Sequence, residues 1–261
     1  MLTPTEHQIR ERLARVEEYS GVRLLFAAEA GSRAWGFASP DSDFDVRFVF
    51  ARSPERYLSV RALDEQIGPI MEGDLDLAGW DLRKALRLLA KSNGPLLEWL
   101  GSPIRYAGDD RLVENWRALA AEVLCPRRLA AHYAGMANGA WQRCAEQGAA
   151  ASAKRLLYAA RALLAARWVA TRAAIPPVRF ADLVAGQAGE LPPGIPAALD
   201  QLAAAKRELA ESDPAPPCAE LRDFLRSETM AIAATVEALE PRAPDLDRVD
   251  AFFRESLGIG G

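Results

Sequence analysis

The chain has 261 residues, of which 50% are hydrophobic and 26% are charged, and its net charge at pH 7 is −4. This is the composition of a globular protein with enough apolar residues for one large domain or two small ones. It excludes a surface coated with positive charge for non-specific nucleic-acid binding, although it leaves room for a local basic groove.

No apolar run reaches transmembrane length, because Arg167 and Arg172 interrupt the most apolar candidate, and the N-terminus lacks a signal-peptide pattern. We therefore expect a cytoplasmic protein with no membrane segment. Three distant cysteines without CxxC spacing indicate neither a disulfide framework nor a zinc site. With only two histidines, any metal should be held mostly by oxygen, which favours Mg²⁺ or Mn²⁺.

The N-terminal segment predicts a helix followed by a strand. Thr3-Pro4-Thr5-Glu6 has the form of a capping box with proline at the first helical position, and Ile9, Leu13 and Val16 form the apolar stripe of a helix that ends near Ser20-Gly21. The apolar run from Val22 to Ala28 has the length of a strand and stops at a turn, Gly31-Ser32.

The alternation of Phe44, Val46, Phe48 and Phe50 predicts a second strand with one buried face, so Asp43, Asp45 and Arg47 share the other face. Residues two apart in a strand lie roughly 6.5 to 7 Å apart, and two carboxylates at that spacing repel unless a cation or a proton lies between them. A divalent metal fits this place. Alternatively, Asp43 belongs with Asp41 to a turn in which aspartates bind nearby backbone N–H groups. Arg47 either orients Asp45 through a salt bridge or points to solvent.

The segment "GDLDL", residues 73–77, predicts a further acidic strand in which Asp74 and Asp76 lie opposite Leu75 and Leu77. Its apolar flanks favour Asp76 over Asp74 as a site residue. Asp81 has the character of an N-cap for a helix over 82–91, which Asn93-Gly94-Pro95 ends. The outer face of this helix is basic and is either solvated or a nucleic-acid contact. It carries Arg83, Lys84, Arg87 and Lys91.

From about Asp109 the chain is rich in Ala and Leu with helical spacing and no clear strand. We expect helices from Pro126, over 151–173 and near 246–257, and a connection rich in Pro and Gly over 175–196. The fold class is therefore α+β, with a mixed sheet and flanking helices in an N-terminal domain over 1–107 and an all-helical C-terminal domain over 108–261.

One segment of the chain consists of Gly31-Ser32, ten further residues and then Asp43-Phe44-Asp45-Val46. This segment resembles the signature of the DNA polymerase β-type nucleotidyltransferase superfamily. The chain is also similar to the YcgL-like branch of this superfamily, the RNA-ligase-associated polymerase β (RlaP) proteins. The similar segments are "GSRAWGFASPDSDFDVRF", "DLAGWDLRKALRLLAKSNGPLLEWLGSPIRY" and "KRLLYAARALLAARW". The resemblance covers most of residues 29 to 170.

The resemblance implies a polymerase β-like catalytic domain with two-metal phosphoryl transfer. Two Mg²⁺ or Mn²⁺ ions, about 3.5 to 4 Å apart, would bridge the acidic strands and a nucleoside triphosphate while an acceptor hydroxyl attacks the α-phosphate. Asp43 and Asp45 would ligate the metals. Asp76 would hold the metal that activates the acceptor and could receive its proton. The acceptor would be an RNA 3′ end in RNA repair.

The same resemblance implies nucleotide-binding residues in both halves of the chain. Gly31 would let the backbone approach the triphosphate, Ser32 would donate to a phosphate oxygen, and Arg33 is either a phosphate contact or a solvated loop residue. Lys154, Tyr158 and Arg161 share one helix face and would recognise triphosphate and base, unless Tyr158 packs and the two cations are solvated.

Two alternatives stay open beside an RNA-directed transferase. One is a protein-modifying transferase of the antitoxin type, which attaches a nucleoside monophosphate to a partner protein. The other is a non-catalytic nucleotide- or RNA-binding module of the same fold. Loss of an acidic position would favour the module, but Asp43, Asp45 and Asp76 are all present.

Overall fold

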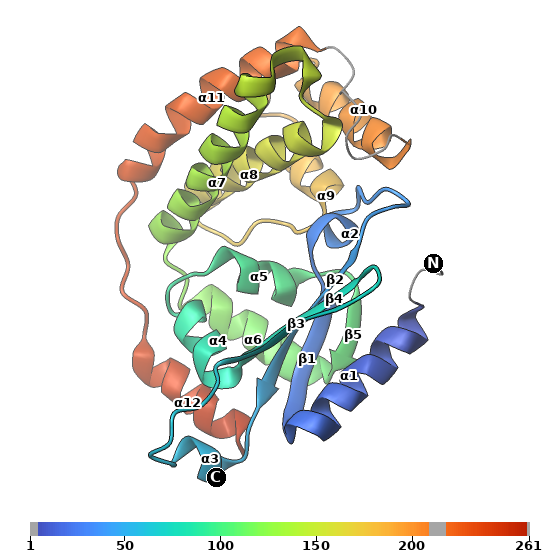
Figure 1. Cartoon of the computed structure of the whole chain (residues 1–261). Helices are drawn as coiled ribbons and strands as arrows, with labels where there is room; N and C mark the ends of the chain where they lie inside the picture. The colour runs from blue at the N-terminus through green and yellow to red at the C-terminus, as the bar shows by residue number, and fades with distance from the viewer. Residues whose placement is uncertain (1–4, 209–217, 260–261) are drawn as a thin grey trace. The chain divides into compact units, whose positions relative to one another are not determined.

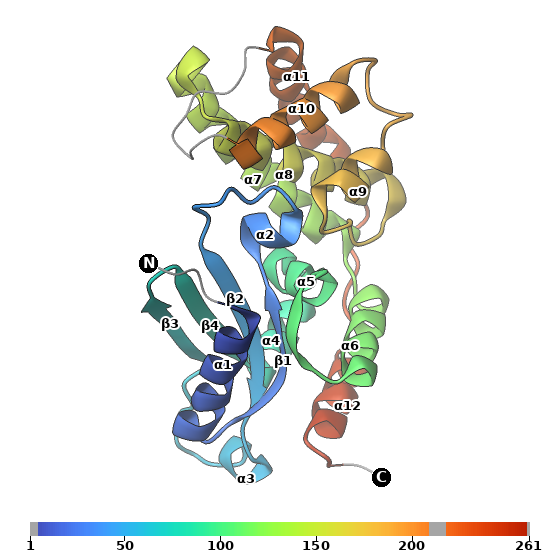
Figure 2. The same ribbon diagram turned by 90° about the vertical axis from the view of Figure 1, so that its right-hand side faces the viewer.

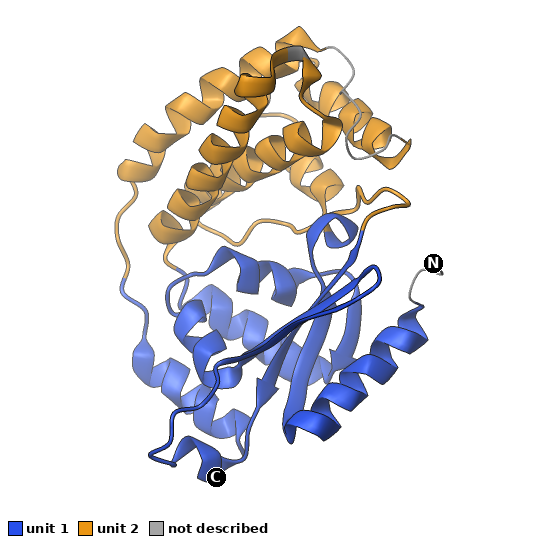
Figure 3. Cartoon of the chain, in the orientation of Figure 1, with its two compact units in different colours: residues 1–34, 43–124, 243–261 blue, residues 35–42, 125–242 orange. Residues whose placement is uncertain are grey.

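The computed structural model describes residues 5–208 and 218–259. The chain forms two compact units, each assembled from segments distant in sequence (Figure 3). Unit 1 contains residues 1–34, 43–124 and 243–261, and unit 2 contains residues 35–42 and 125–242. The division at residue 107 therefore stays a prediction about domains, while the compact unit around the sheet extends beyond it and includes the C-terminal helix.

Unit 1 holds a five-stranded mixed sheet in the order β3-β4-β2-β1-β5 (Figure 1). The pair β2 and β4 is parallel, and all other neighbours are antiparallel. The strands are β1 (Arg23–Glu29), β2 (Phe44–Ala51), β3 (Gln66–Glu72), β4 (Leu75–Asp81) and β5 (Arg105–Gly108). The helices are α1 (Glu6–Ser20), α2 (Gly31–Trp35), α3 (Pro54–Tyr57), α4 (Leu82–Leu89), α5 (Gly94–Gly101), α6 (Asp110–Glu122) and α12 (Leu246–Ser256).

Helix α1 covers one face of the sheet, and α4 and α5 lie on the other (Figures 1 and 2). The predicted stripe of α1 is confirmed, because Ile9, Leu13 and Val16 are buried in a core cluster with apolar residues of β1, β2 and β4. The predicted cap was two residues too early. Thr5 forms the capping box with Gln8 and is the N-cap, while Thr3 and Pro4 lie outside the described residues.

The end of β4 leads directly into α4. Asp81 caps this helix as predicted, with its carboxylate accepting a hydrogen bond from the Arg83 N–H at 2.9 Å. The helix ends at Leu89, two residues earlier than expected, because Ser92 adopts a left-handed backbone conformation with φ of 56°. Asn93 then begins a new helix, α5, as its N-cap.

Unit 2 consists of helices and connections within its described residues, which confirms the expected helical C-terminal part. The helices are α7 (Pro126–Gln147), a 3-10 turn η1 (Gly148–Ala150), α8 (Ala153–Arg172), α9 (Phe180–Ala185), α10 (Ile195–Glu208) and α11 (Ala219–Glu237). Helix α8 is the most buried of them, and α7 and α11 pack against it. In the part of the chain that the structure describes, no helix has both the length and the apolarity to cross a membrane.

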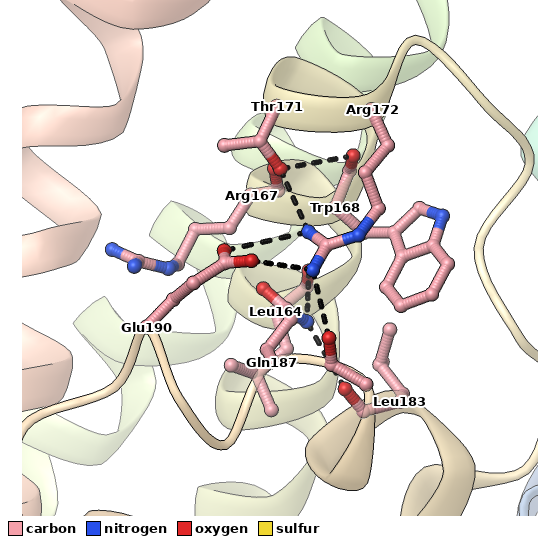
Figure 4. A network of polar contacts seen from close by, with 9 residues as sticks. Leu164, Arg167, Trp168, Thr171, Arg172, Leu183, Gln187 and Glu190 are labelled. Carbon is pink, nitrogen blue, oxygen red and sulfur yellow. Dashed lines mark hydrogen bonds and ion pairs between the residues drawn. The ribbon is translucent and has the colours of Figure 1, made fainter.

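A polar network joins the C-terminal end of α8 to the segment after α9 (Figure 4). The Arg172 guanidinium donates to the Gly186 carbonyl at 2.7 Å and pairs with the Glu190 carboxylate at 2.6 Å. Gln187 is buried and donates to the carbonyls of Leu164 and Leu183, both at 3.1 Å. These bonds fix the proline- and glycine-rich connection that the sequence predicts, and α9 lies within it.

Candidate functional site

Two acidic strands of the predicted site lie side by side. In the parallel pair β2 and β4, Asp45 lies directly opposite Asp76. Val46 and Leu77 belong to the core cluster under α1, so strand alternation turns Asp45 and Asp76 to the opposite face. The predicted buried face of β2 is thus confirmed. The sheet has brought together two carboxylates that are 31 residues apart in the sequence.

Arg47 connects these two carboxylates. Its Nη2 donates to Asp45 Oδ1 at 3.0 Å and to Asp76 Oδ2 at 2.7 Å. Its Nη1 donates to the backbone carbonyls of Asp76 at 2.9 Å and Val46 at 3.2 Å. The sequence allowed Arg47 either to form a salt bridge or to point to solvent. In the structure it forms a salt bridge, with Asp76 as well as with Asp45.

The Gly-Ser segment lies against Asp45. Gly31 begins the short helix α2 with φ of 59°, where glycine is strongly favoured. A Cβ atom at this position would lie 2.3 Å from Asp45 Oδ2. The preceding Ala30 N–H donates to the Asp45 carbonyl at 2.8 Å. Glycine is therefore required both by the backbone turn and by the close approach of the Asp45 carboxylate. The adjacent Ser32 is buried.

Glu29, which the sequence analysis did not single out, also holds Asp45. Its side chain is fully buried; Oε1 accepts a hydrogen bond from the Asp45 N–H at 2.8 Å, and Oε2 accepts one from the Tyr106 hydroxyl. Burial raises the pKa of the Glu29 carboxyl, against the lowering effect of these hydrogen bonds. A glutamate ending an otherwise apolar strand, "RLLFAAE", is the signal that could have revealed this residue.

Asp43 and Arg33 lie where the chain enters β2. Asp43 is exposed and precedes the strand, and its carbonyl accepts a hydrogen bond from Arg33 Nε at 3.0 Å. The Arg33 guanidinium stacks 3.7 Å above the centre of the Phe44 ring, a cation–π contact. In residues 5–208 and 218–259, no group of three or more His, Cys, Asp or Glu side chains is arranged to hold a metal ion. The three-carboxylate group thus stays a prediction, and the observed pair is Asp45 with Asp76.

The structure separates the roles of Asp74 and Asp76. Asp74 lies in the turn between β3 and β4, where its carbonyl accepts a hydrogen bond from the Phe44 N–H at 2.7 Å and pins the start of β2. Asp76 lies in β4 itself. Its Oδ1 atom is buried and has no hydrogen-bond partner in the structure. Such an atom is costly unless it binds a ligand.

These observations fit a hard divalent cation at the Asp45–Asp76 pair. The donors are all carboxylate oxygens, which Mg²⁺ and Mn²⁺ prefer. One of them, Asp76 Oδ1, is buried and has no hydrogen bond in the structure.

The predicted nucleotide-binding residues of α8 belong to unit 2, where the segment 35–42 packs against them. The Tyr158 ring contacts that of Trp35, with 5.0 Å between ring centres. Arg161 is 2% exposed, and its guanidinium lies 4.2 Å from the centre of the Trp35 ring. Lys154, one turn before Tyr158, is half-buried. Both aromatic packing and nucleotide recognition thus stay open for this helix face.

Comparison with known proteins finds a matching family and chains that are similar to this one. The model of the RNA repair pathway DNA polymerase beta family (RlaP) matches residues 5–255. The uncharacterized protein YcgL of Bacillus subtilis (strain 168) is 35% identical over 241 residues, which are 92% of each chain. The crystal structure of a nucleotidyltransferase-like protein from Exiguobacterium sibiricum 255-15 matches 95% of this chain and 79% of its own, with 9% identity and a TM-score of 0.33.

Proposed function

Because the chain belongs to the RNA repair pathway DNA polymerase beta family, we propose that it is a metal-dependent nucleotidyltransferase. It moves a nucleoside monophosphate from a nucleoside triphosphate to an acceptor hydroxyl. The observation that carries the proposal is the register of β2 and β4, which sets Asp45 opposite Asp76 with Gly31 against the Asp45 carboxylate. The family description suggests an RNA 3′ end as the acceptor.

In the proposed reaction, the acceptor oxygen attacks the α-phosphorus in line, the bond to the bridging oxygen breaks, and pyrophosphate leaves. Asp45 and Asp76 hold Mg²⁺ or Mn²⁺, and exposed Asp43, just before β2, is the further candidate ligand. When bound, the cation neutralises triphosphate charge and lowers the pKa of the acceptor hydroxyl. Asp76 is the proposed proton acceptor, because its buried Oδ1 has no hydrogen bond in the structure.

The segment Gly31 to Arg33 is the proposed triphosphate contact. Gly31 lets the backbone come close to the acidic strand, Ser32 donates a hydroxyl hydrogen bond, and Arg33 supplies charge beside the start of β2. The stacking of Arg33 on Phe44 and its bond to the Asp43 carbonyl hold it at this entrance. Lys154, Tyr158 and Arg161 stay candidates for the rest of the nucleotide.

The test is incubation of the purified protein with Mg²⁺ or Mn²⁺, each α-labelled nucleoside triphosphate in turn and a mixed RNA pool. We expect label in RNA, and a loss of roughly a hundredfold or more in rate for Asp45→Asn and for Asp76→Asn, since each removes a charged ligand. Asp74→Asn is the matched control, since it removes the same charge two residues from Asp76 in the turn before β4.

The destination of the label separates the three functions. Label in RNA supports the proposal, and label in protein indicates the protein-modifying alternative. Metal-dependent nucleotide binding without transfer to either acceptor would contradict the transferase and favour the binding module. If Asp74→Asn abolished transfer while Asp76→Asn left it intact, the third carboxylate would be Asp74, and the pairing of β2 with β4 would not explain the chemistry.

A further inference from the structure

Arg47 forms a salt bridge with both carboxylates of the candidate site. A single guanidinium nitrogen, Nη2, contacts both carboxylates, Asp45 and Asp76, within about 3 Å. The cationic side chain therefore lies between the two carboxylates that are proposed to hold the metal.

Local contacts hold the guanidinium firmly in this place. Its second nitrogen, Nη1, donates to the carbonyls of Val46 and Asp76, one from each of the paired strands. The Arg47 side chain is 18% exposed, and those of Asp45 and Asp76 are 35% and 20% exposed. Charges in such a half-buried cluster are less screened than surface charges. Arginine also stays protonated at any working pH, so it cannot lose its charge in place and must move instead.

This bridge leaves one oxygen of the Asp76 carboxylate without a hydrogen bond in the structure. Arg47 binds Oδ1 of Asp45 and Oδ2 of Asp76. The other oxygen of Asp76 is buried and has no hydrogen bond in the structure, and the other oxygen of Asp45 faces Gly31. Asp76 thus keeps an oxygen for a second ligand, which a purely structural ion pair would not require.

We propose that Arg47 is an internal counter-cation that competes with the divalent cation for Asp45 and Asp76. Without a metal, it keeps two repelling carboxylates aligned across β2 and β4. When a metal binds the pair, Nη2 leaves the carboxylates, while Nη1 has its own anchors on the two backbone carbonyls. Cation binding at this site is thus an exchange of one positive group for another. The inference rests on the proposed function only in taking a divalent cation as the ligand.

The test measures binding of Mn²⁺ alone, from the electron paramagnetic resonance signal of free Mn²⁺, in wild type and Arg47→Gln. We expect Arg47→Gln to bind Mn²⁺ at least about tenfold more tightly, because the competing charge is gone. Mn²⁺ should also raise the melting temperature of Arg47→Gln more than that of wild type, since a ligand bound only by the native state stabilises it. The control is Arg87→Gln, which removes one exposed charge of unit 1, paired with Glu65, and should bind like wild type.

Arg47→Lys keeps the charge but lacks the planar fork, so we expect Mn²⁺ affinity between those of wild type and Arg47→Gln. This variant keeps the test decisive if Arg47→Gln does not fold. Equal or weaker Mn²⁺ binding by Arg47→Gln would overturn the inference, as would a lysine variant that binds as tightly as the glutamine variant. This test measures Mn²⁺ binding and not nucleotide transfer. A protein that fails the transfer assay can therefore still support the proposed exchange of Arg47 for a metal ion. If neither wild type nor Arg47→Gln binds Mn²⁺, the inference and the metal dependence of the proposed function fail together.

Discussion

At the scale of single residues, the site depends on the absence of a side chain at Gly31 as much as on the two carboxylates. The Cβ of any other residue would lie 2.3 Å from Asp45 Oδ2, closer than non-bonded contacts of Cβ atoms in real proteins. The carboxylate, anchored by Arg47 and by the backbone bonds of Asp45, would have to move. A methyl group at Gly31 therefore disturbs the geometry of the charged pair directly.

We expect Gly31→Ala to weaken Mn²⁺ binding and nucleotide transfer and to destabilise the protein. Gly21→Ala is the matched control, because Gly21 has nearly the same φ, 58° against 59°, but nothing within 4 Å of its Cβ position. Both variants should lose about 1 to 2 kcal/mol for the left-handed backbone. Only Gly31→Ala should lose more and should also lose Mn²⁺ affinity. Equal losses in stability and equal Mn²⁺ binding would show that the contact with Asp45 is unimportant.

At the scale of elements, the clearest strand and helix patterns were predictable. The alternation of Phe44 to Phe50 and the stripe of Ile9, Leu13 and Val16 each need one buried face, and such a face leaves a regular period in the sequence. Two strands left no such period. β3 is an edge strand interrupted by Gly68-Pro69, and β5 has only four residues.

The site was predictable only in part, for a related reason. Asp45 and Asp76 stand out because each is flanked by apolar residues in a strand. Their pairing depends on which strands become neighbours, and this is a tertiary property that local patterns do not contain. The Glu29 bond to the Asp45 N–H and the Arg47 bridge to Asp76 also cross between elements. The pattern within one strand predicts the face of the sheet on which Arg47 lies, but it does not predict which residues Arg47 contacts.

Asp81, at the junction of β4 and α4, leads to a prediction about how the stability of the protein depends on pH. Asp81 is 2% exposed, accepts hydrogen bonds from the Tyr57 hydroxyl and the Arg83 N–H, both at 2.9 Å, and lies 3.8 Å from Arg52 Nε. Burial raises the pKa of the Asp81 carboxyl above its ordinary value, and its hydrogen bonds and the nearby arginines only partly oppose this. The native state therefore binds this proton more tightly than the unfolded state does.

It follows that the contribution of Asp81 to the free energy of unfolding is complete below its ordinary pKa and declines as the pH rises through the raised value. Asp81→Asn cannot ionise, and asparagine is also a good N-cap. We expect the stability of Asp81→Asn relative to wild type to increase between about pH 4 and pH 7 in urea denaturation. Comparison of the two chains cancels the other groups that titrate in this range. A difference that shifts towards wild type with rising pH would contradict the raised pKa.

At the scale of the whole molecule, the linear order of the chain does not follow its compact units. Composition changes near Asp109, so a sequence analysis divides the chain there. Yet α6 and α12 complete unit 1, and the segment 35–42 between the Gly-Ser turn and Asp43 belongs to unit 2. No local sequence pattern marks the point where the chain goes back to unit 1, because both units contain amphipathic helices of the same kind.

The C-terminal helix α12 should therefore stabilise the unit that carries the candidate site. The buried Phe252 ring contacts the buried Trp116 ring of α6, with 5.1 Å between centres, and Trp116 in turn contacts Phe26 of β1. We expect Phe252→Ala to lower the free energy of unfolding by about 3 to 5 kcal/mol. Leu246→Ala, in the same helix but with Leu246 59% exposed, should change it by less than about 0.5 kcal/mol.

Urea denaturation of both variants, followed by tryptophan fluorescence, measures this difference. Loss of unit 1 stability would reach the site through β1, because Phe26 and Glu29 lie on the same strand and Glu29 holds the backbone of Asp45. Phe252→Ala should thus lose nucleotide transfer at a lower temperature than wild type while keeping its Mn²⁺ affinity at temperatures where it is folded. If Phe252→Ala cost no more than Leu246→Ala, α12 would not contribute to the stability of the unit that carries the candidate site.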